Sequence, residues 1–202
     1  IAVAIEDGDI FSTEYMETLK QINDEVFFLP GVDRSNLRSL WTPNVRWTEV
    51  TEYGFDGGPV TNHPSYTNEE DLDELRGNVL KSGEIGRLVG NNFKSSIIEV
   101  PLQEFYPNPE NQSELLRLDY KEFSHQLEEK IRDRFQADNP NIKIHIVGFA
   151  KKVGDLIDGL MGVVAFFGIA FLITFVLLYL FTWCIRSTVS VLVTTVIAVI
   201  WQ

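Results

Sequence analysis

The first third of the chain carries one clear helical pattern between strand-like runs. Apolar side chains recur there at steps of three and four residues, at Phe11, Tyr15, Leu19, Ile22, Val26 and Leu29. Residues three and four apart share one face of a helix, so this pattern predicts an amphipathic helix that Pro30 and Gly31 terminate. AVAIE before it, and VDRSNLRSL and VRWTEVTEY after it, predict strands, and the Gly- and Pro-rich GFDGGPVTNHPS predicts a closing loop.

Two further helices are predicted by their caps and apolar stripes. Asn68 is the expected N-cap of a helix that ends at Gly83, with an acidic first turn at the positive end of the helix dipole. Its apolar stripe is Leu72, Leu75 and Val79. The third helix is expected from Asp119 to about Gln136, with one face formed by Tyr120, Phe123, Leu127, Ile131 and Phe135.

The remaining patterns in this part of the chain predict strands. GRLVG and SSIIEVPLQEF follow the second helix, and NIKIHIVGF alternates so that Ile142, Ile144 and Ile146 share a face. The element order is therefore β-α-β-β, α-β-β, α-β. It indicates an α+β fold of the split β-α-β (ferredoxin-like) kind, with helices on one face of a mixed or antiparallel sheet.

The last fifty residues follow a different pattern. No charged residue occurs from Gly159 to Ile185, and about 20 apolar residues suffice to cross a ~30 Å hydrocarbon core. We therefore expect an extracytoplasmic domain over residues 1–152 and a transmembrane helix with a protruding stalk over 153–185. The run VSVLVTTVIAVIWQ is too short to cross, so residues 188–202 are expected to be a truncated transmembrane helix.

Charge changes this picture in two ways. Residues 1–152 carry 27 acidic and 16 basic side chains, a formal charge of −11, which disfavours nucleic acid as a partner. Arg186 lies in the short connection Cys184–Thr188, so the positive-inside rule places it in the cytoplasm and residues 1–152 outside. Lys151 and Lys152 weaken this asymmetry and are interpreted as snorkelling anchors at the outer headgroups.

Motifs that would carry chemistry are scarce. Cys184 is the single cysteine, and His63, His125 and His145 are scattered, so neither a disulfide framework nor a metal site is expected. The run EEDLDE is interpreted as a solvated helix start, and NQS at 111–113 has the form of a glycosylation sequon. We expect no enzyme activity and no cofactor. The opening IAVAIEDGD, without Met, suggests a start inside a longer protein.

Three stretches together carry a family resemblance. They are DIFSTEYMETLKQINDEVFFLPGVDRSNLRSL, LRGNVLKSGEIGRLVGNNFKSSIIEVPL and IHIVGFAKKVGDLIDGLMGVVAFFGIAFLITFVLLYLFTWCIRST. They resemble the first extracytoplasmic loop and following helices of the resistance–nodulation–division (RND) superfamily, in the branch of predicted exporters akin to the MmpL and hopanoid-transporter group. The resemblance covers nearly the whole chain and lies in lengths and short phrases such as LPGV.

The resemblance implies a function in the bacterial inner membrane. Residues 1–152 would be a periplasmic porter domain between the first two helices of a twelve-helix, proton-driven exporter of hydrophobic or lipid-like molecules. The expected partners are this substrate, the lipid bilayer and the remainder of the same transporter chain, with a homo-oligomer left open. The proton-relay carboxylates of the family lie on a later helix, and none maps onto this sequence.

The start of the apolar tail supplies the candidate site residues. Gly154, Gly159 and Gly162 either pack against a neighbouring helix or form a hinge that transmits membrane-domain motion, since glycine weakens a helix by about 1 kcal/mol relative to alanine. Asp155 and Asp158 share a face three residues apart, as solvated end charges or as gate residues on the substrate path.

Two other functions remain open from the sequence. One is an extracytoplasmic sensor or receptor domain on a membrane anchor, which would need a cytoplasmic signalling domain elsewhere in its chain. The other is the extracytoplasmic domain of an ABC-type permease, whose transport would depend on an ATP-binding partner.

Overall fold

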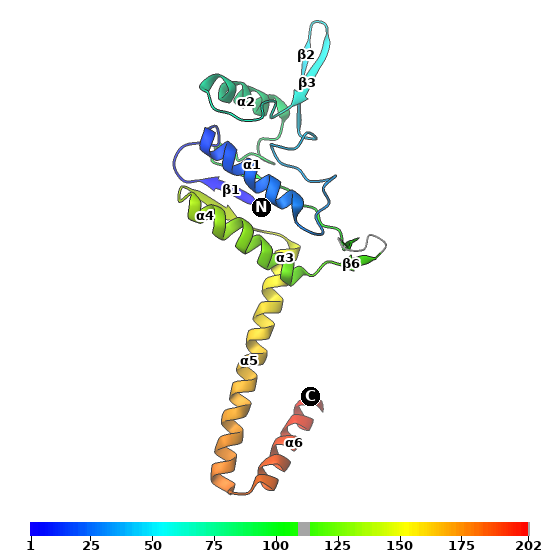
Figure 1. Ribbon diagram of the computed structural model, residues 1–202, viewed down its shortest axis with the longest axis vertical. Coiled ribbons are helices and arrows are strands. Elements are labelled where there is room, and N and C mark those ends of the chain that lie inside the picture. Colours follow the sequence, from blue (N-terminus) through cyan, green and yellow to red (C-terminus); the bar gives the residue numbers. More distant parts are fainter. Residues whose placement is uncertain (109–113, 202) are drawn as a thin grey trace. The chain divides into compact units, whose positions relative to one another are not determined.

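The computed structural model describes residues 1–108 and 114–201, the side chains of residues 199 and 200 excepted (Figure 1). The sequon at 111–113 lies outside the described residues. The chain divides into two compact units, of which the first is Ile1–Gly154 and the second begins at Asp155. The first unit is an α+β domain, and the second consists of helices.

The central sheet of the first unit joins strands that are far apart in the sequence. Its strand order among the described residues is β4-β1-β7, and β1 pairs antiparallel with both neighbours. The strands are β1 (Ala2–Ile5), β4 (Ser95–Ile97) and β7 (Ile142–His145). The sheet is therefore antiparallel, one of the two forms predicted. A split β-α-β unit keeps its two parallel strands apart, so its neighbouring strands also pair antiparallel.

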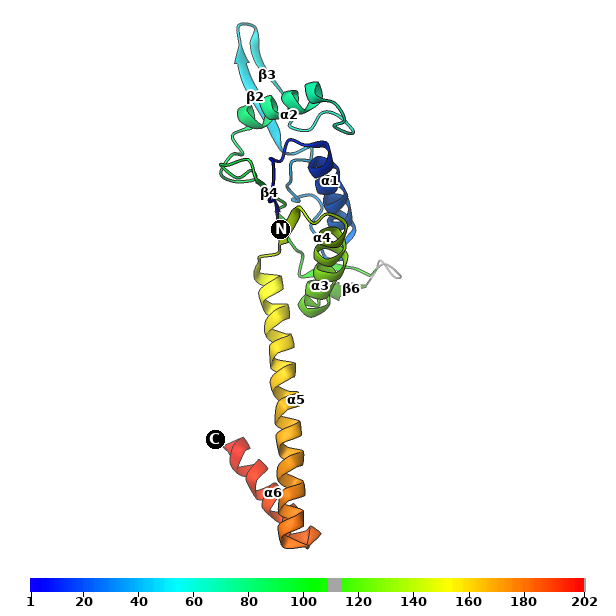
Figure 2. The ribbon, with the colours of Figure 1, turned by 90° about the vertical axis from the view of Figure 1, so that its left-hand side faces the viewer.

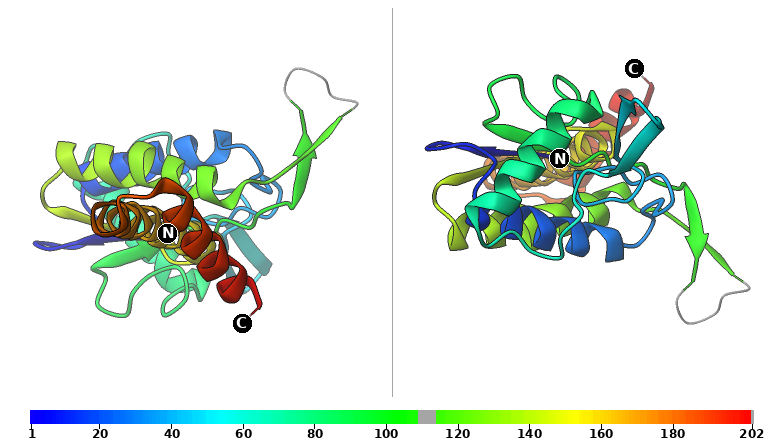
Figure 3. Two further views of the ribbon diagram at one scale, coloured as in Figure 1. Left: turned by 90° about the horizontal axis from the view of Figure 1, so that it is seen from below. Right: turned by 90° about the horizontal axis from the view of Figure 1, so that it is seen from above.

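One face of this sheet is covered by helices. Val3 pairs with Ser96 and with Ile144, and all three are buried. Helices α1 (Thr13–Phe28), α3 (Tyr120–Leu127) and α4 (Arg134–Asp138) lie on the same side of β1 (Figures 2 and 3). The predicted alternation of β7 is confirmed, because Ile142, Ile144 and Ile146 are all buried.

Helix α1 forms where the sequence predicts it. Ser12 is its N-cap and accepts a hydrogen bond from the Tyr15 amide, which satisfies one of the free N–H groups of the first turn. All six residues of the predicted stripe are buried. Within the core, the Tyr15 hydroxyl donates to the Val3 carbonyl at 2.7 Å, and the Ser96 amide donates to that hydroxyl at 3.0 Å. Tyr15 thereby ties α1 to both β1 and β4.

Helix α2 (Glu69–Ser82) is also confirmed, together with its caps. The Asn68 side chain accepts from the Asp71 amide at 2.8 Å, and Gly83 ends the helix with a left-handed φ of 71°. The Lys81 ammonium lies 2.6 Å from a Glu49 carboxylate oxygen and 5.3 Å from the centroid of the Trp47 ring, which is within the range of a cation–π contact. These contacts attach the hairpin of β2 (Arg46–Thr51) and β3 (Gly54–Pro59) to α2.

Two strand predictions are wrong, and each error has a local cause. Residues 34–36 form a turn, because the Asp33 carboxylate accepts from the Ser35 amide and the Asn36 side chain. On either side of it, Val32 and Arg38 make only isolated antiparallel bridges. GRLVG is likewise a turn, in which the Leu88 and Val89 amides donate to the Glu84 carbonyl. The expected loop 54–65 instead supplies β3, the partner of β2, and SSIIEVPLQEF keeps only β4 as a regular strand.

The third helix is continuous but widens in its middle. Between α3 and α4 lies a π-helical turn, η1 (Glu128–Asp133). Phe123, Leu127, Ile131 and Phe135 are all buried although they are spaced by four, a step that drifts about 40° per repeat around an α-helix of 3.6 residues per turn. A turn with more residues offsets this drift and keeps the four side chains on the core. The short hairpin of β5 (Phe105–Pro107) and β6 (Leu115–Arg117) was not predicted.

The second unit contains most of α5 (Phe149–Thr182) and α6 (Ile185–Trp201). Helix α5 is long and apolar enough to cross a membrane, and Ile185–Ala198 is a shorter apolar helix. The predicted helix bounds of 153 and 185 are corrected to 149 and 182. The turn is Trp183–Cys184, so Arg186 lies within α6 rather than in the connection. Near this turn the Thr182 and Thr188 hydroxyls are hydrogen-bonded at 3.0 Å.

Replacement of Tyr15 by Phe should destabilise residues 1–154. The change removes a buried hydroxyl and leaves the Val3 carbonyl and the Ser96 amide without their partner, a loss of about 1–3 kcal/mol. Urea unfolding followed by circular dichroism measures it. Burial also raises the pKa of Tyr15, so its contribution is present at neutral pH and is lost as the pH rises above about 10. Tyr53→Phe, at a side chain that is 98% exposed, is the control and should unfold like the unmodified protein.

Candidate functional site

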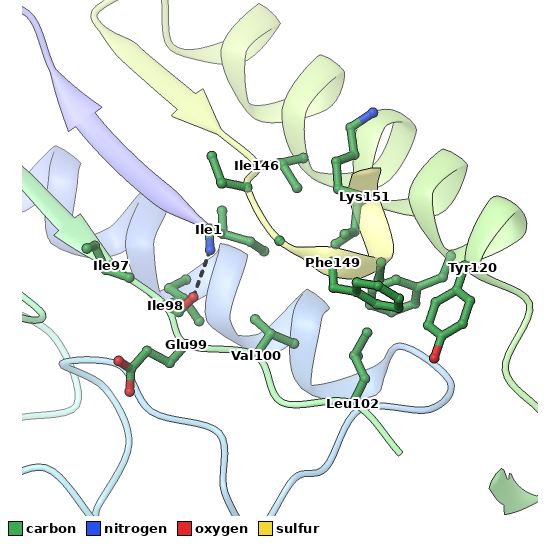
Figure 4. A pocket seen from close by; sticks show the side chains of 15 residues that line it. Ile1, Ile97, Ile98, Glu99, Val100, Leu102, Tyr120, Ile146, Phe149 and Lys151 are labelled. Atoms are coloured by element: carbon green, nitrogen blue, oxygen red, sulfur yellow. Dashed lines mark hydrogen bonds between the residues drawn. The ribbon is translucent and has the colours of Figure 1, made fainter. Parts of the chain in front are cut away.

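A cavity of about 440 Å³ lies in the first unit where the chain leaves β7 and enters α5 (Figure 4). Its walls come from Ile1 and three further segments: the residues from β4 to Leu102, helix α3, and residues 146–151. These segments are brought together by the pairing of β1 with β4 and β7. Its size lies within the range of small-molecule sites.

The cavity is lined mainly by aliphatic and aromatic side chains. Ile98, Phe123 and Leu127 form its buried part, with exposed fractions of 5% or less. Val147 and Phe149 are 76% and 73% exposed, although both are apolar. The cavity therefore combines an apolar interior with apolar residues that face water.

The charged groups at the cavity are engaged in ion pairs. Glu99 lies 3.5 Å from the Arg87 guanidinium and 3.9 Å from that of Arg38. The Lys151 ammonium lies 2.8 Å from the Glu128 carboxylate. Because each charge has an opposite charge nearby, binding in this cavity would rest on apolar contact rather than on a net charge.

The first turn of α5 is packed tightly on α3. A Cβ atom on Gly154 would lie 2.4 Å from Ser124 Cβ and 2.9 Å from the Tyr120 carbonyl oxygen, so only glycine permits this approach. The rings of Tyr120 and Phe149 meet edge to face at 5.7 Å, and the pair of Lys151 and Glu128 adds a third contact. Any displacement of this turn therefore acts directly on α3, which forms one wall of the cavity.

The predicted site residues fall on both sides of the boundary between the units. Gly154 is buried in the contact with α3, whereas a Cβ on Gly159 or Gly162 would meet no described atom within 4 Å. Asp155 is exposed and Asp158 is half-buried, one turn apart on α5. Their roles as hinge and gate stay predictions.

The cavity itself was missed by sequence reasoning. Ile97, Val100 and Phe149 were assigned to strands, and nothing in their local pattern shows that they meet. The available signal was the pair Val147 and Phe149, apolar residues at the start of a membrane-length helix. Among the residues that the structure describes, no group of three or more His, Cys, Asp or Glu side chains is placed to hold a metal ion.

Comparison of the chain with protein-family models, with curated proteins and with solved structures gave no match.

Substitution by alanine should distinguish the role of Gly154 from that of Gly159 and Gly162. Gly154→Ala should destabilise residues 1–154 by about 1–3 kcal/mol, because the added methyl overlaps Ser124 and the α3 backbone. The double change Gly159→Ala and Gly162→Ala should leave that unfolding transition unchanged and stiffen α5, since each alanine favours helix by about 1 kcal/mol. Denaturant unfolding measures the first effect, and hydrogen exchange of residues 155–165 in the whole chain measures the second.

If the hinge prediction is right, the double variant should also lower transport by the protein that contains this chain. Transport at the unmodified rate, with slowed hydrogen exchange, would refute the hinge and favour a packing role for these glycines.

Proposed function

We propose that the chain is part of a proton-driven RND-type exporter of hydrophobic or lipid-like molecules. Residues 1–152 would be a porter domain in the periplasm, and α5 and α6 would belong to the transmembrane domain in the cell inner membrane. The ferredoxin-like description of porter subdomains is part of this proposal, and the antiparallel pairing of β1 with β4 is compatible with it.

The observation that carries the proposal is the position of the apolar cavity on the chain. Residues 149–151 line the cavity and are also the first turn of α5, the helix that is long and apolar enough to cross a membrane. A hydrophobic molecule drawn from the outer leaflet would find apolar side chains at Val147 and Phe149. Each methylene group transferred from water into such a cavity gains about 0.8 kcal/mol.

Release of the molecule would require the cavity to change shape. Helix α5 contacts α3 through Gly154, Phe149 and Lys151, so a tilt or rotation of α5 would move the α3 wall with it. Proton movement elsewhere in the transporter would supply the energy, and the membrane helices would carry the motion to the porter domain. No covalent step is needed for this cycle, and the chain is not proposed to be an enzyme.

The proposed topology can be tested by cysteine labelling. A cysteine in place of Asn68 should react with a membrane-impermeant maleimide in intact spheroplasts, whereas one in place of Ser187, beside Arg186, should react only after permeabilisation. Both variants should carry Cys184→Ser, because Cys184 is exposed. Equal labelling of the two positions in intact spheroplasts would contradict the topology.

The proposed substrate cavity can be tested with a matched pair of valines. Val147 at the cavity and Val50 on β2 are both 76% exposed. Val147→Asn should lower crosslinking of a photoactivatable fatty acid about threefold or more, because a polar side chain weakens apolar contact at the cavity. Val50→Asn should crosslink like the unmodified protein.

The same pair tests the exporter. In cells, export should be abolished by an uncoupler and should persist when ATP is depleted with the proton gradient kept. Val147→Asn should lower it and Val50→Asn should not. Crosslinking without any export would support the cavity as a binding site but contradict the proposed transport, and would favour a receptor.

A further inference from the structure

A second cavity, of about 330 Å³, lies in the first unit between the outer face of α1 and residues 64–67. It shares no lining residue with the cavity at α5. Its chemistry is also different, because its lining includes charged side chains of α1 and the indole ring of Trp41. The proposed exporter function does not use this cavity.

The aromatic wall of this cavity is held in place. The Trp41 indole nitrogen donates to the Met16 carbonyl at 3.1 Å, and its ring meets that of Tyr66 at 5.7 Å and 66°. Tyr66 is 2% exposed, and burial raises the pKa of its hydroxyl, so the ring remains neutral at physiological pH. A fixed, uncharged aromatic face is the surface on which cations bind through cation–π attraction.

The segment opposite α1 is held as well. The Asn62 side chain donates to one carboxylate oxygen of Glu74 at 2.5 Å, and His63 lies 3.2 Å from the other. These hydrogen bonds keep the pKa of Glu74 below its ordinary value, so the carboxylate stays charged and the attachment to α2 persists at neutral pH. The Pro64 carbonyl is thereby presented to the cavity from a fixed position.

The cavity already accommodates an ammonium group of the protein. The Lys20 ammonium donates to the Pro64 carbonyl at 2.5 Å and lies 5.2 Å from the Trp41 ring centroid. The cavity thus supplies two groups that bind a primary ammonium, a carbonyl acceptor and an aromatic face.

Two carboxylates flank this ammonium along α1. Glu17 and Asp24 both line the cavity and both are exposed. They are seven residues apart, which is about 10 Å along a helix. Within the described part of the chain, neither takes part in an ion pair. The flanking charge is therefore available to a cation and repels an anion.

We propose that this second cavity binds a linear diamine or polyamine, with one primary ammonium in the place of the Lys20 ammonium and a second at Glu17 or Asp24. The methylene chain between them lies on Trp41. A primary ammonium fits better than a quaternary one, because only the former has an N–H group to donate to the Pro64 carbonyl. The acidic character of the whole domain draws such cations toward it.

Isothermal titration of the whole 202-residue chain in detergent tests the ligand class. The probes are 1,5-diaminopentane, pentylamine, tetramethylammonium and 1,5-pentanediol. The diamine should bind most tightly, pentylamine more weakly and tetramethylammonium more weakly still, while the uncharged diol should not bind. The proposal would be overturned if the diamine did not bind, if salt did not weaken its binding, or if the diol bound as tightly as the diamine.

Substitutions on α1 and α2 test the site. Glu17→Gln and Asp24→Asn should each weaken diamine binding about two- to fivefold, and Glu14→Gln, outside the cavity on the same helix, should not. Lys20→Gln should strengthen binding about twofold or more, because the competing ammonium is gone. Lys81→Gln makes the same change of charge away from the cavity and should have no effect.

The variants also distinguish the site from a general charge effect. Equal changes in Glu14→Gln and Glu17→Gln, or in Lys81→Gln and Lys20→Gln, would show that net charge alone attracts the amine and would reject the cavity. Weaker binding in Lys20→Gln would reject the proposed exchange of ammonium groups. Fatty-acid crosslinking at the other cavity should be the same in all these variants, so failure here is separable from failure of the proposed exporter.

Discussion

The close contact between Gly154 and Ser124 is the constraint on which the functional interpretation depends. It brings the first turn of α5 onto α3 at a distance that no side chain at residue 154 would allow. The same turn carries Phe149 and Lys151, which contact Tyr120 and Glu128. The start of a membrane-length helix is thereby built into the core of the α+β unit and into the wall of its apolar cavity. A flexible linker at this point would leave the cavity open and would transmit no motion from the helix.

The helices were predictable because their signals are local. Ser12 and Asn68 cap their helices with their own side chains, and the α1 stripe is buried as its spacing requires. The strands were less predictable because their partners decide them. Residues 32–40 were predicted to form a strand, but the Asp33 side chain accepts from nearby donors and makes a turn the better solution. Strand β3 contains three glycines and becomes a strand through its pairing with β2.

The candidate sites could not be predicted for a related reason. Each cavity is assembled from segments that meet only in the folded chain: residues 97–102 with 146–151 in one case, and Lys20 with Trp41 and Pro64 in the other. The sequence did indicate the region of α5, because glycines and apolar residues gather at its start. It gave no sign of the second cavity, since Lys20 and Trp41 carry no pattern until α1 and residues 64–67 face each other.

The two cavities use different physical forces, and this difference has a functional consequence. Apolar contact at the α5 cavity depends on the area removed from water and changes little with salt in the physiological range. Attraction of an amine to Glu17 and Asp24 is screened over a Debye length of about 8 Å at 0.15 M ionic strength and weakens as salt rises. Under the two proposals, a single acidic domain would bind a neutral hydrophobic molecule and a cation at separate sites, because the two cavities share no lining residue.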